Sequence, residues 1–308
     1  MTPLAGSIYH FQEFTVSHTP DTSRFRGVFA FANQKGGVGK TTTAVSLAAC
    51  LADEGVDTLL VDFDPQGNAS TGLGIDRRTV TTGTYEVLGG ADPAEGIRAT
   101  EIERLSVLPS TIDLAGAEIE LVAAFARESK LRSVLAPIRE RYAAILIDSP
   151  PSLGLLTVNA LVAADAVVVP IQCEYYALEG LGQLLRTLEL VRDGLNPRLD
   201  VAGVVLTMFD ARTRLAEQVV AEVRRHFDDK VFRSVIPRSV RLSEAPGFGR
   251  PITRYDPATR GAQAYRDLTR EFVTRWIEHH PAAEPAPEEH RTIDLDAPAP
   301  VDHGKEMT

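Results

Sequence analysis

The feature that most constrains the fold is a series of short apolar segments separated by stretches with helical character. Most of these segments are apolar at consecutive positions, which is typical of strands buried on both faces of a sheet. Helical patterns lie between them, as in residues 40–55, where Gly55 is suited to end a helix. This alternation predicts an α/β fold with a doubly wound, mainly parallel sheet flanked by helices, in a single domain. We expect strands at residues 27–33, 57–64, 105–109, 143–150, 165–171, 201–209 and 230–237.

The composition divides the 308 residues into three zones. Residues 1–25 mix polar and aromatic side chains without a sustained period, and we expect a flexible extension. Residues 26–280 are predicted to form the folded body. Residues 281–308 are rich in Pro, Ala and Glu. Such a segment buries too little apolar surface to offset the entropy of ordering, so we expect a disordered acidic tail.

The net charge of −10 is unevenly distributed along the chain. The tail holds seven acids and two bases, a balance of −5, whereas residues 203–270 hold thirteen bases and eight acids, a balance of +5. Total charge therefore does not exclude an anionic partner, because the local distribution decides what a surface attracts.

Compartment signals favour the cytoplasm. The apolar runs are too short or too interrupted to cross a bilayer, and the start of the chain lacks a basic region followed by an apolar one. The two cysteines, Cys50 and Cys173, form neither a C-x-x-C motif nor a disulfide framework. We expect two reduced and mostly buried thiols.

The stretch "NQKGGVGKTT" follows a predicted strand and opens a predicted helix. It departs from the common phosphate-loop pattern, because Gln34 replaces the first glycine and Lys35 stands beside it. Its three glycines allow a tight turn whose N–H groups face an anion, and the positive end of the helix dipole adds to this. Lys40 is placed to reach the β/γ-phosphate oxygens, the Thr41 hydroxyl to ligate Mg²⁺, and Thr42 to contact the α-phosphate.

Acidic residues follow two of the other buried strands. Asp62 and Asp64 end one strand and Asp148 ends another, so all three are expected at the edge of the sheet where the glycine loop lies. Asp62 and Asp64 are two positions apart, which would direct both toward a metal-bound phosphate or its attacking water. Asp148 has the form of a Walker B aspartate. Each motif alone is weak evidence, and the alternative for Asp62 and Asp64 is an ordinary aspartate turn.

Together these segments resemble the ParA/Soj family of chromosome- and plasmid-partitioning ATPases, which carry the deviant Walker A motif K-G-G-x-G-K-[ST]. The resemblance covers about residues 26–278, in order. It is carried by "NQKGGVGKTT", "VDFDPQGNAS", "IDSPPSLGLLTVNAL", "PIQCEYYALEGL" and "IPRSVRLSEAPGFGRPI". It implies a deviant P-loop NTPase fold over residues 26–280.

The resemblance also implies roles for individual residues. Lys35 matches the signature lysine that reaches the partner's phosphates across an ATP-sandwich dimer. Lys40 and Thr41 match the in-subunit phosphate and Mg²⁺ ligands. Asp64 matches the carboxylate that positions or activates the hydrolytic water, and Asp148 matches the Walker B aspartate, which holds Mg²⁺ directly or through water.

The remaining nucleotide contacts follow from the same resemblance. Pro237 lies where the family contacts adenine, and Ser239 stands where the family often has Asn. The cofactors implied are ATP and Mg²⁺. The nucleotide-binding set is Lys35, Gly36, Gly37, Val38, Gly39, Lys40, Thr41, Thr42 and Pro237.

Arginines are concentrated in residues 212–250. Composition alone favours a solvated helix face, but the resemblance matches Arg212 and Arg241 to arginines used for DNA binding. Because no base-reading motif is apparent, we expect contacts to phosphates and sequence-independent binding to double-stranded DNA. The expected partners are a second copy of the chain when ATP is bound and a ParB-like centromere-binding protein that stimulates a weak ATPase, with nucleoid association in the cytoplasm.

Three rival functions share parts of this sequence. A MinD-like membrane-cycling ATPase needs a basic amphipathic helix at its C-terminus. Residues 265–280 are amphipathic, but the acidic tail that follows would be repelled by an anionic membrane. A redox ATPase like the nitrogenase iron protein needs cysteines that hold a cluster, and neither Cys50 nor Cys173 lies in such a motif. Nothing in the sequence indicates the third rival, a scaffold without turnover.

Overall fold

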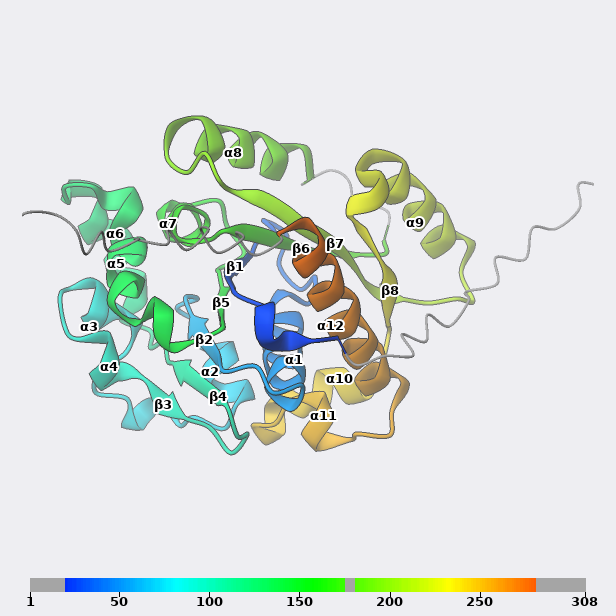
Figure 1. Cartoon of the computed structure of the whole chain (residues 1–308), viewed down its shortest axis with the longest axis horizontal. Coiled ribbons are helices and arrows are strands. Elements are labelled where there is room, and N and C mark those ends of the chain that lie inside the picture. The colour runs from blue at the N-terminus through cyan, green and yellow to red at the C-terminus, as the bar shows by residue number, and fades with distance from the viewer. Residues whose placement is uncertain (1–19, 175–180, 281–308) are drawn as a thin grey trace, which may run out of the picture.

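The computed structural model describes residues 20–174 and 181–280, so most of the predicted extension and all of the predicted tail lie outside the described residues. The central feature is one eight-stranded sheet with the order β3-β4-β2-β5-β1-β6-β7-β8 (Figure 1). All seven predicted strands are present. The sequence did not predict β3, a two-residue edge strand that pairs antiparallel with β4. The strands are β1 (Gly27–Phe31), β2 (Thr58–Asp62), β3 (Arg98–Ala99), β4 (Leu105–Leu108), β5 (Ala144–Asp148), β6 (Ala166–Gln172), β7 (Asp200–Phe209) and β8 (Val231–Pro237).

Helices cover both faces of this sheet, as the sequence predicts. Figure 1 shows α1 and α12 side by side over one face, and α7 and α8 lie over the other. The helices are α1 (Lys40–Asp53), α2 (Asn68–Gly72), α3 (Thr84–Leu88), α4 (Pro93–Gly96), α5 (Leu114–Glu120), α6 (Lys130–Leu135), α7 (Leu155–Ala163), α8 (Leu181–Gly194), α9 (Arg214–Phe227), α10 (Val240–Glu244), α11 (Ile252–Tyr255) and α12 (Arg260–His279).

The position of β1 between two hydrophobic cores explains why its sequence is apolar at consecutive positions. Val28 and Ala30 belong to the core on the α7 side, whereas Phe29 and Phe31 belong to the core on the α1 side. Successive side chains of a strand point to opposite faces, and here each face is covered by helices. A strand that packs two cores has no solvent-facing position to fill with a polar residue.

The strand order places the end of β1 at a point where the chain's path diverges. Strand β1 is paired with β5 on one side and β6 on the other, in parallel. The chain runs from β1 to β2 on the β5 side, while the later strands β7 and β8 extend beyond β6. In open α/β sheets ligands bind outside the carboxyl ends of the strands at such a switch point. The glycine-rich loop follows β1 at this place.

The core extends to a residue before the predicted body. Phe25 is fully buried and stacks on Phe29, with 5.6 Å between ring centroids. It follows a short 3₁₀ helix, η1 (Thr22–Arg24), that is capped by Asp21. The ordered chain therefore begins before residue 26, because an aromatic side chain at position 25 completes the core on the α1 side.

Helix α12 belongs to this aromatic core. Phe272 and Trp276 lie edge-on to Phe29, and the indole N–H of Trp276 donates to the Arg26 carbonyl at 2.8 Å. The amphipathic pattern of residues 265–280 is thus explained by packing on the sheet. In the described ranges, no helix combines the length and the apolarity needed to cross a membrane.

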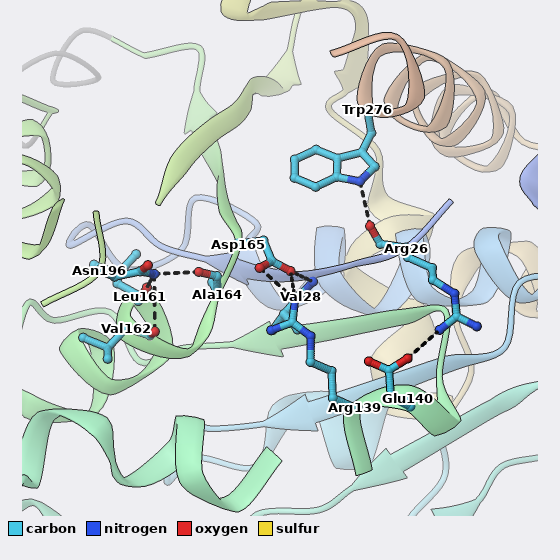
Figure 2. A network of polar contacts seen from close by, with 10 residues as sticks. All are labelled: Arg26, Val28, Arg139, Glu140, Leu161, Val162, Ala164, Asp165, Asn196 and Trp276. Carbon is cyan, nitrogen blue, oxygen red and sulfur yellow. Dashed lines mark hydrogen bonds and ion pairs between the residues drawn. The ribbon is translucent and has the colours of Figure 1, made fainter. Parts of the chain in front are cut away.

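The amino edge of the sheet is held by a polar network (Figure 2). Asp165 accepts the N–H of Val28 at 2.8 Å and two hydrogen bonds from Arg139, which joins the starts of β1 and β6 to the η5 helix (Ala136–Arg141). The buried Asn196 amide donates to three carbonyls after and within α7, those of Leu161, Val162 and Ala164. These contacts are far from the switch point and stabilise the opposite edge.

Candidate functional site

The glycine-rich loop between β1 and α1 has the geometry that its sequence predicts. Gly37 and Gly39 have φ angles of 75° and 85°, in the left-handed region that favours glycine. Gly39 is also the N-cap of α1, and no side chain caps this helix. The first N–H groups of α1 are therefore available to an anion, with the positive end of the helix dipole behind them.

Three polar side chains that sequence reasoning missed hold this loop in place. The Asn33 amide donates to the Pro170 carbonyl at 2.8 Å and its oxygen accepts the N–H of Lys35 at 3.0 Å. The Thr207 hydroxyl of β7 donates to the Val38 carbonyl at 2.8 Å. The Ser149 hydroxyl donates to the carbonyl of Phe31 at 2.6 Å. The only available signal was their position at the carboxyl ends of strands. The loop is anchored to β6 and β7, and the end of β1 before the loop is anchored to the residue after β5.

Lys40, the first residue of α1, is buried among carboxylates. Burial lowers the pKa of Lys40, and the neighbouring carboxylates of Asp148 and Asp64 oppose that shift. A buried ammonium held next to a helix N-terminus is a strong site for phosphate oxygens. The role of Lys40 as the in-subunit phosphate ligand stays a prediction.

Asp148 is fully buried at the end of β5, and neither of its carboxylate oxygens has a hydrogen-bond partner among the described residues. Burial raises the pKa of Asp148 well above its usual range, and the nearby Asp62 raises it further. The Thr41 hydroxyl and the Lys40 ammonium oppose the shift. A buried carboxylate without hydrogen bonds is costly, and a cation bound at this position would offset that cost.

Asp62 differs from the expectation that it faces the phosphates together with Asp64. Its carboxylate accepts the backbone N–H of Ser70 at 2.7 Å and the Ser70 hydroxyl at 2.6 Å, which ties β2 to α2. Burial raises the pKa of Asp62 to about 6, partly offset by these hydrogen bonds. Strand β2 ends at Asp62, so the alternation that would align the two acids does not extend to position 64.

Asp64 lies in the turn after β2, close to Lys40. It is buried, and one carboxylate oxygen accepts the N–H of Gln66 at 2.9 Å. Lys35 lies on the glycine-rich loop and is half-buried, and its ammonium has no ion pair or hydrogen bond among the described residues. The two lysines of the motif therefore differ: Lys40 is buried close to two acids, whereas Lys35 forms no ion pair within the part of the chain that the structure describes.

The residues around Lys40 fit a hydrated Mg²⁺ ion. Asp62, Asp64 and Asp148 supply three carboxylates against one buried ammonium, an imbalance that a divalent cation would correct. No group of three or more His, Cys, Asp or Glu side chains in the described residues could hold a metal alone. Mg²⁺ suits such a site, because it is usually bound by one or two protein oxygens together with phosphates and water. Thr41 and Asp148 would be its protein ligands.

A small pocket opens beside the start of α1. It lies between Thr41 and Thr42 on one side and Leu242, Pro246 and Arg250 on the other. Pro237 ends β8 at the same edge of the sheet and is half-buried. The structure thus brings the predicted phosphate-loop residues together with the carboxylates of Asp64 and Asp148. Pro237 lies at the same edge of the sheet.

Arg212 and Arg241 follow β7 and β8 and lie at the carboxyl edge of the sheet. Arg212 pairs with Asp210 at 2.7 Å, and its hydrogen bonds lower the pKa of Asp210 to about 2. Arg241 pairs with Glu244 at 3.0 Å and with Asp256 at 3.6 Å. Both side chains are more than half exposed, so these pairs are open to exchange for another anion.

Other arginines of this region are also paired with acids. Arg225 pairs with Glu222, and Arg238 pairs with Glu174 at 2.6 Å. Helix α9 buries Ala216, Val219, Val220 and Val223, which leaves its charged residues on the outer side. Several of the thirteen bases of residues 203–270 therefore already have an acidic partner in the folded protein.

Comparison with known proteins places these features in a family. The family model described as an AAA domain matches residues 26–201. The sporulation initiation inhibitor protein Soj of Bacillus subtilis is 58% identical over 247 residues, covering 80% of this chain and 98% of Soj. The chromosome partitioning protein ParA of Caulobacter vibrioides (strain NA1000) is 56% identical, covering 80% of this chain and 94% of ParA.

Solved structures share the fold. The cobyrinic acid a,c-diamide synthase of Mycobacterium smegmatis with bound ADP and magnesium has a TM-score of 0.73 at 37% identity, covering 82% of this chain and 96% of that one. MinD of Pyrococcus horikoshii complexed with Mg-ADP has a TM-score of 0.63 at 26% identity, covering 79% and 93%. The identities and coverage of the Soj and ParA proteins decide between these relatives: this chain belongs to the ParA/Soj family of partitioning ATPases.

Proposed function

We propose that this protein is an ATP-dependent DNA segregation ATPase that couples nucleotide state to dimerisation and to DNA binding. The observation that carries the proposal is the contrast between the two lysines of the loop. Lys40 is buried beside Asp148 and Asp64, whereas Lys35 has no partner among the described residues. One lysine completes the site of its own subunit, and the other is free to complete the site of a second copy.

In the bound state, the loop N–H groups and Lys40 hold the β- and γ-phosphates, and Pro237 contacts adenine. Thr41 and Asp148 hold Mg²⁺, which neutralises phosphate charge when it is bound. Asp64 orients the water that attacks the γ-phosphate, because it is the acid of the site that lies in a turn next to Lys40. Lys35 of a second subunit stabilises charge on the transferred phosphoryl group, as an arginine finger does.

The DNA-binding state follows from pairing two subunits. Arg212 and Arg241 lie at the same edge of the sheet as the nucleotide loop, so a dimer formed across this edge doubles their number on one surface. Phosphate oxygens of DNA would replace Asp210, Glu244 and Asp256 as partners of these guanidinium groups. This contact is sequence-independent, and it places the protein on the nucleoid in the cytoplasm.

Hydrolysis ends this state, and a ParB-like centromere-binding protein accelerates it. The names of the relatives support a role in partitioning: one is the chromosome-partitioning ATPase Soj of Treponema pallidum, 51% identical to this chain. Such a cycle of DNA retention and release moves a chromosome or plasmid when the stimulating partner is bound to it.

A DNA-retention assay with purified protein tests the proposal. We expect binding to unrelated DNA sequences with equal affinity in ATP and Mg²⁺, weaker binding in ADP, and a steep loss of affinity with salt. The alternative, membrane cycling like that of MinD, predicts ATP-dependent pelleting with anionic liposomes and no DNA binding. That second outcome would overturn the proposal, and the burial of α12 in the core supports the first.

A further inference from the structure

A run of exposed apolar side chains lies on helix α5 and on the turns before and after it. Ile112, Ile119, Val122 and Phe125 are between 61% and 93% exposed, and we call them the α5 outer face. They account for four of the nine large exposed apolar side chains in the described residues, within a stretch of fourteen. Such a local concentration marks an interaction site more often than scattered exposed side chains do.

The fold does not need these four side chains. Leu114 and Ala117 of α5, and Leu121 directly after it, are buried and pack into the core on the α7 side. Ile112 lies in the turn before α5, Ile119 lies on α5, and Val122 lies in the 3₁₀ turn that follows it. The segment therefore carries exposed apolar side chains in addition to the buried ones that pack into the core.

This segment is connected to the nucleotide site by hydrogen bonds. Ser110, which precedes it, donates its N–H to the Ser70 hydroxyl at 3.1 Å, and that hydroxyl donates to Asp62 at 2.6 Å. On its other side, the Glu118 carboxylate lies against Gly154, the N-cap of α7 that follows the Asp148 loop. A partner that moves α5 would act on the ends of both β2 and β5.

The segment of residues 110–128, which contains the α5 outer face, has a negative balance of charge. Residues 110–128 contain four acids, Asp113, Glu118, Glu120 and Glu128, and one base, Arg127, a balance of −3. Arg127 is itself paired with Glu128 at 2.8 Å. Glu120 accepts the Tyr85 hydroxyl at 2.9 Å and remains exposed at the margin of the apolar surface. An occupant that complements this surface carries apolar side chains flanked by positive charge.

We propose that the α5 outer face docks a positively charged amphipathic segment of the partner protein that stimulates ATP hydrolysis. The identity of that partner rests on the proposed function; the chemistry of the segment rests on the surface itself. DNA is disfavoured as the occupant because the acids repel its phosphates. The acidic tail of this chain, with its balance of −5, is disfavoured for the same reason. A second copy would place like charges opposite each other in a two-fold contact.

Phe125→Ser tests the proposal, with Leu190→Ser on α8 as the matched control. Leu190 is 73% exposed and carries none of the proposed contacts, so both variants remove an exposed apolar side chain without touching the core. Ile119→Ser and Glu120→Lys are second variants at the apolar centre and at the acidic margin. We expect the Phe125, Ile119 and Glu120 variants to keep basal turnover, ATP-dependent dimerisation and DNA binding.

Binding of a purified ParB-like protein, measured by calorimetry, and its stimulation of turnover are the first readouts. Phe125→Ser is expected to weaken binding at least about 10-fold, as loss of a central aromatic anchor does, whereas Leu190→Ser leaves it unchanged. Unchanged affinity in all three surface variants would overturn the inference. Loss of the ATP-dependent dimer in Phe125→Ser would also overturn it, since the occupant would then be a second copy.

A peptide experiment separates this inference from the proposed function. The probe is a fluorescent helical peptide of Leu and Lys with one apolar face, compared with the same peptide carrying Glu in place of Lys. We expect the wild type to bind the Lys peptide more tightly than the Glu peptide, with a loss in salt and a loss of at least about 10-fold in Phe125→Ser. The ParB-like protein could leave wild-type turnover unchanged while the wild type still prefers the Lys peptide. In that case the proposed function fails and the docking surface stands. Equal binding of both peptides would overturn the docking surface.

Discussion

Asp62 and Asp148 are direct register partners at the carboxyl ends of β2 and β5, and both carboxylates are completely buried. Asp62 is compensated by two hydrogen bonds from Ser70, whereas Asp148 has no hydrogen-bond partner among the described residues. Each carboxylate is in a position to disfavour the charge of the other. The nucleotide site therefore contains an unfavourable negative charge that a bound cation would relieve.

The first prediction concerns the cost of this charge. Asp148→Asn is expected to raise the stability of the nucleotide-free protein by about 1 kcal/mol, because it removes a buried carboxyl group that has no hydrogen-bond partner among the described residues and that Asp62 disfavours. The same substitution is expected to abolish the Mg²⁺-dependent part of ATP affinity. Thermal unfolding and nucleotide binding with and without Mg²⁺ measure the two effects. Asp193→Asn, which removes an exposed carboxylate on α8, should change neither, and a destabilised Asp148→Asn with normal Mg²⁺ dependence would contradict the assignment.

The second prediction separates the role of Asp64 in chemistry from its role in the turn. Asp64→Asn retains an oxygen that can accept the N–H of Gln66, but it cannot take up a proton from water. Asp64→Asn and Asp64→Ala are both expected to bind ATP and to lose turnover about 10²-fold or more. Single-turnover measurement of phosphate release checks this. Wild-type turnover in Asp64→Asn would limit this residue to holding the turn.

The third prediction concerns Lys35. Because its ammonium has no partner in the described residues, Lys35→Ala should leave folding and monomer stability unchanged within about 0.5 kcal/mol. It should nevertheless weaken the ATP-dependent dimer at least about 10-fold, since a charge-assisted contact across the interface is lost. Light scattering in ATP gives the oligomeric state. Lys130→Ala is the control, and an unchanged dimer in Lys35→Ala would remove this lysine from the interface.

The fourth prediction tests the DNA surface by charge reversal. Arg241→Glu should abolish DNA retention while sparing ATP binding, because it places an acid beside Glu244 and Asp256. Arg198→Glu makes the same change of charge in an exposed residue before β7, at the amino edge of the sheet. DNA retention should be normal in that variant. If DNA retention falls equally in both variants, the total charge of the protein governs DNA binding, and Arg241 has no specific role.

The fifth prediction concerns helix α12. Trp276→Ala removes a buried indole that packs on Phe29 and donates to the Arg26 carbonyl, so it should lower the free energy of unfolding by about 3–5 kcal/mol. Phe248→Ala, at an exposed aromatic residue, should cost less than about 1 kcal/mol. Urea unfolding measures both. A normal stability for Trp276→Ala would mean that α12 does not hold the core.

The sequence predicted the sheet well because its strands are buried on both faces. A strand such as β1 has to be apolar at every position, and such a run is visible without knowledge of its neighbours. The two-residue strand β3 was missed, since an edge strand of this length has no comparable pattern. The amphipathic helix α12 was identified as amphipathic, but its partner, the aromatic core with Phe25, was visible only in the tertiary structure.

For the functional site, the sequence by itself determined which groups are present: a glycine loop, two lysines, and acids at the ends of strands. Backbone conformation and local order along the chain carry this information, because glycine at positive φ and a helix start are local requirements. The tertiary structure decided how these groups differ. Packing paired Asp62 with Ser70 and buried Lys40, and within the described part of the chain it left the Asp148 carboxylate without a hydrogen bond and the Lys35 ammonium without an ion pair. Burial and hydrogen bonding depend on residues distant in sequence, and they set the electrostatic role of each side chain.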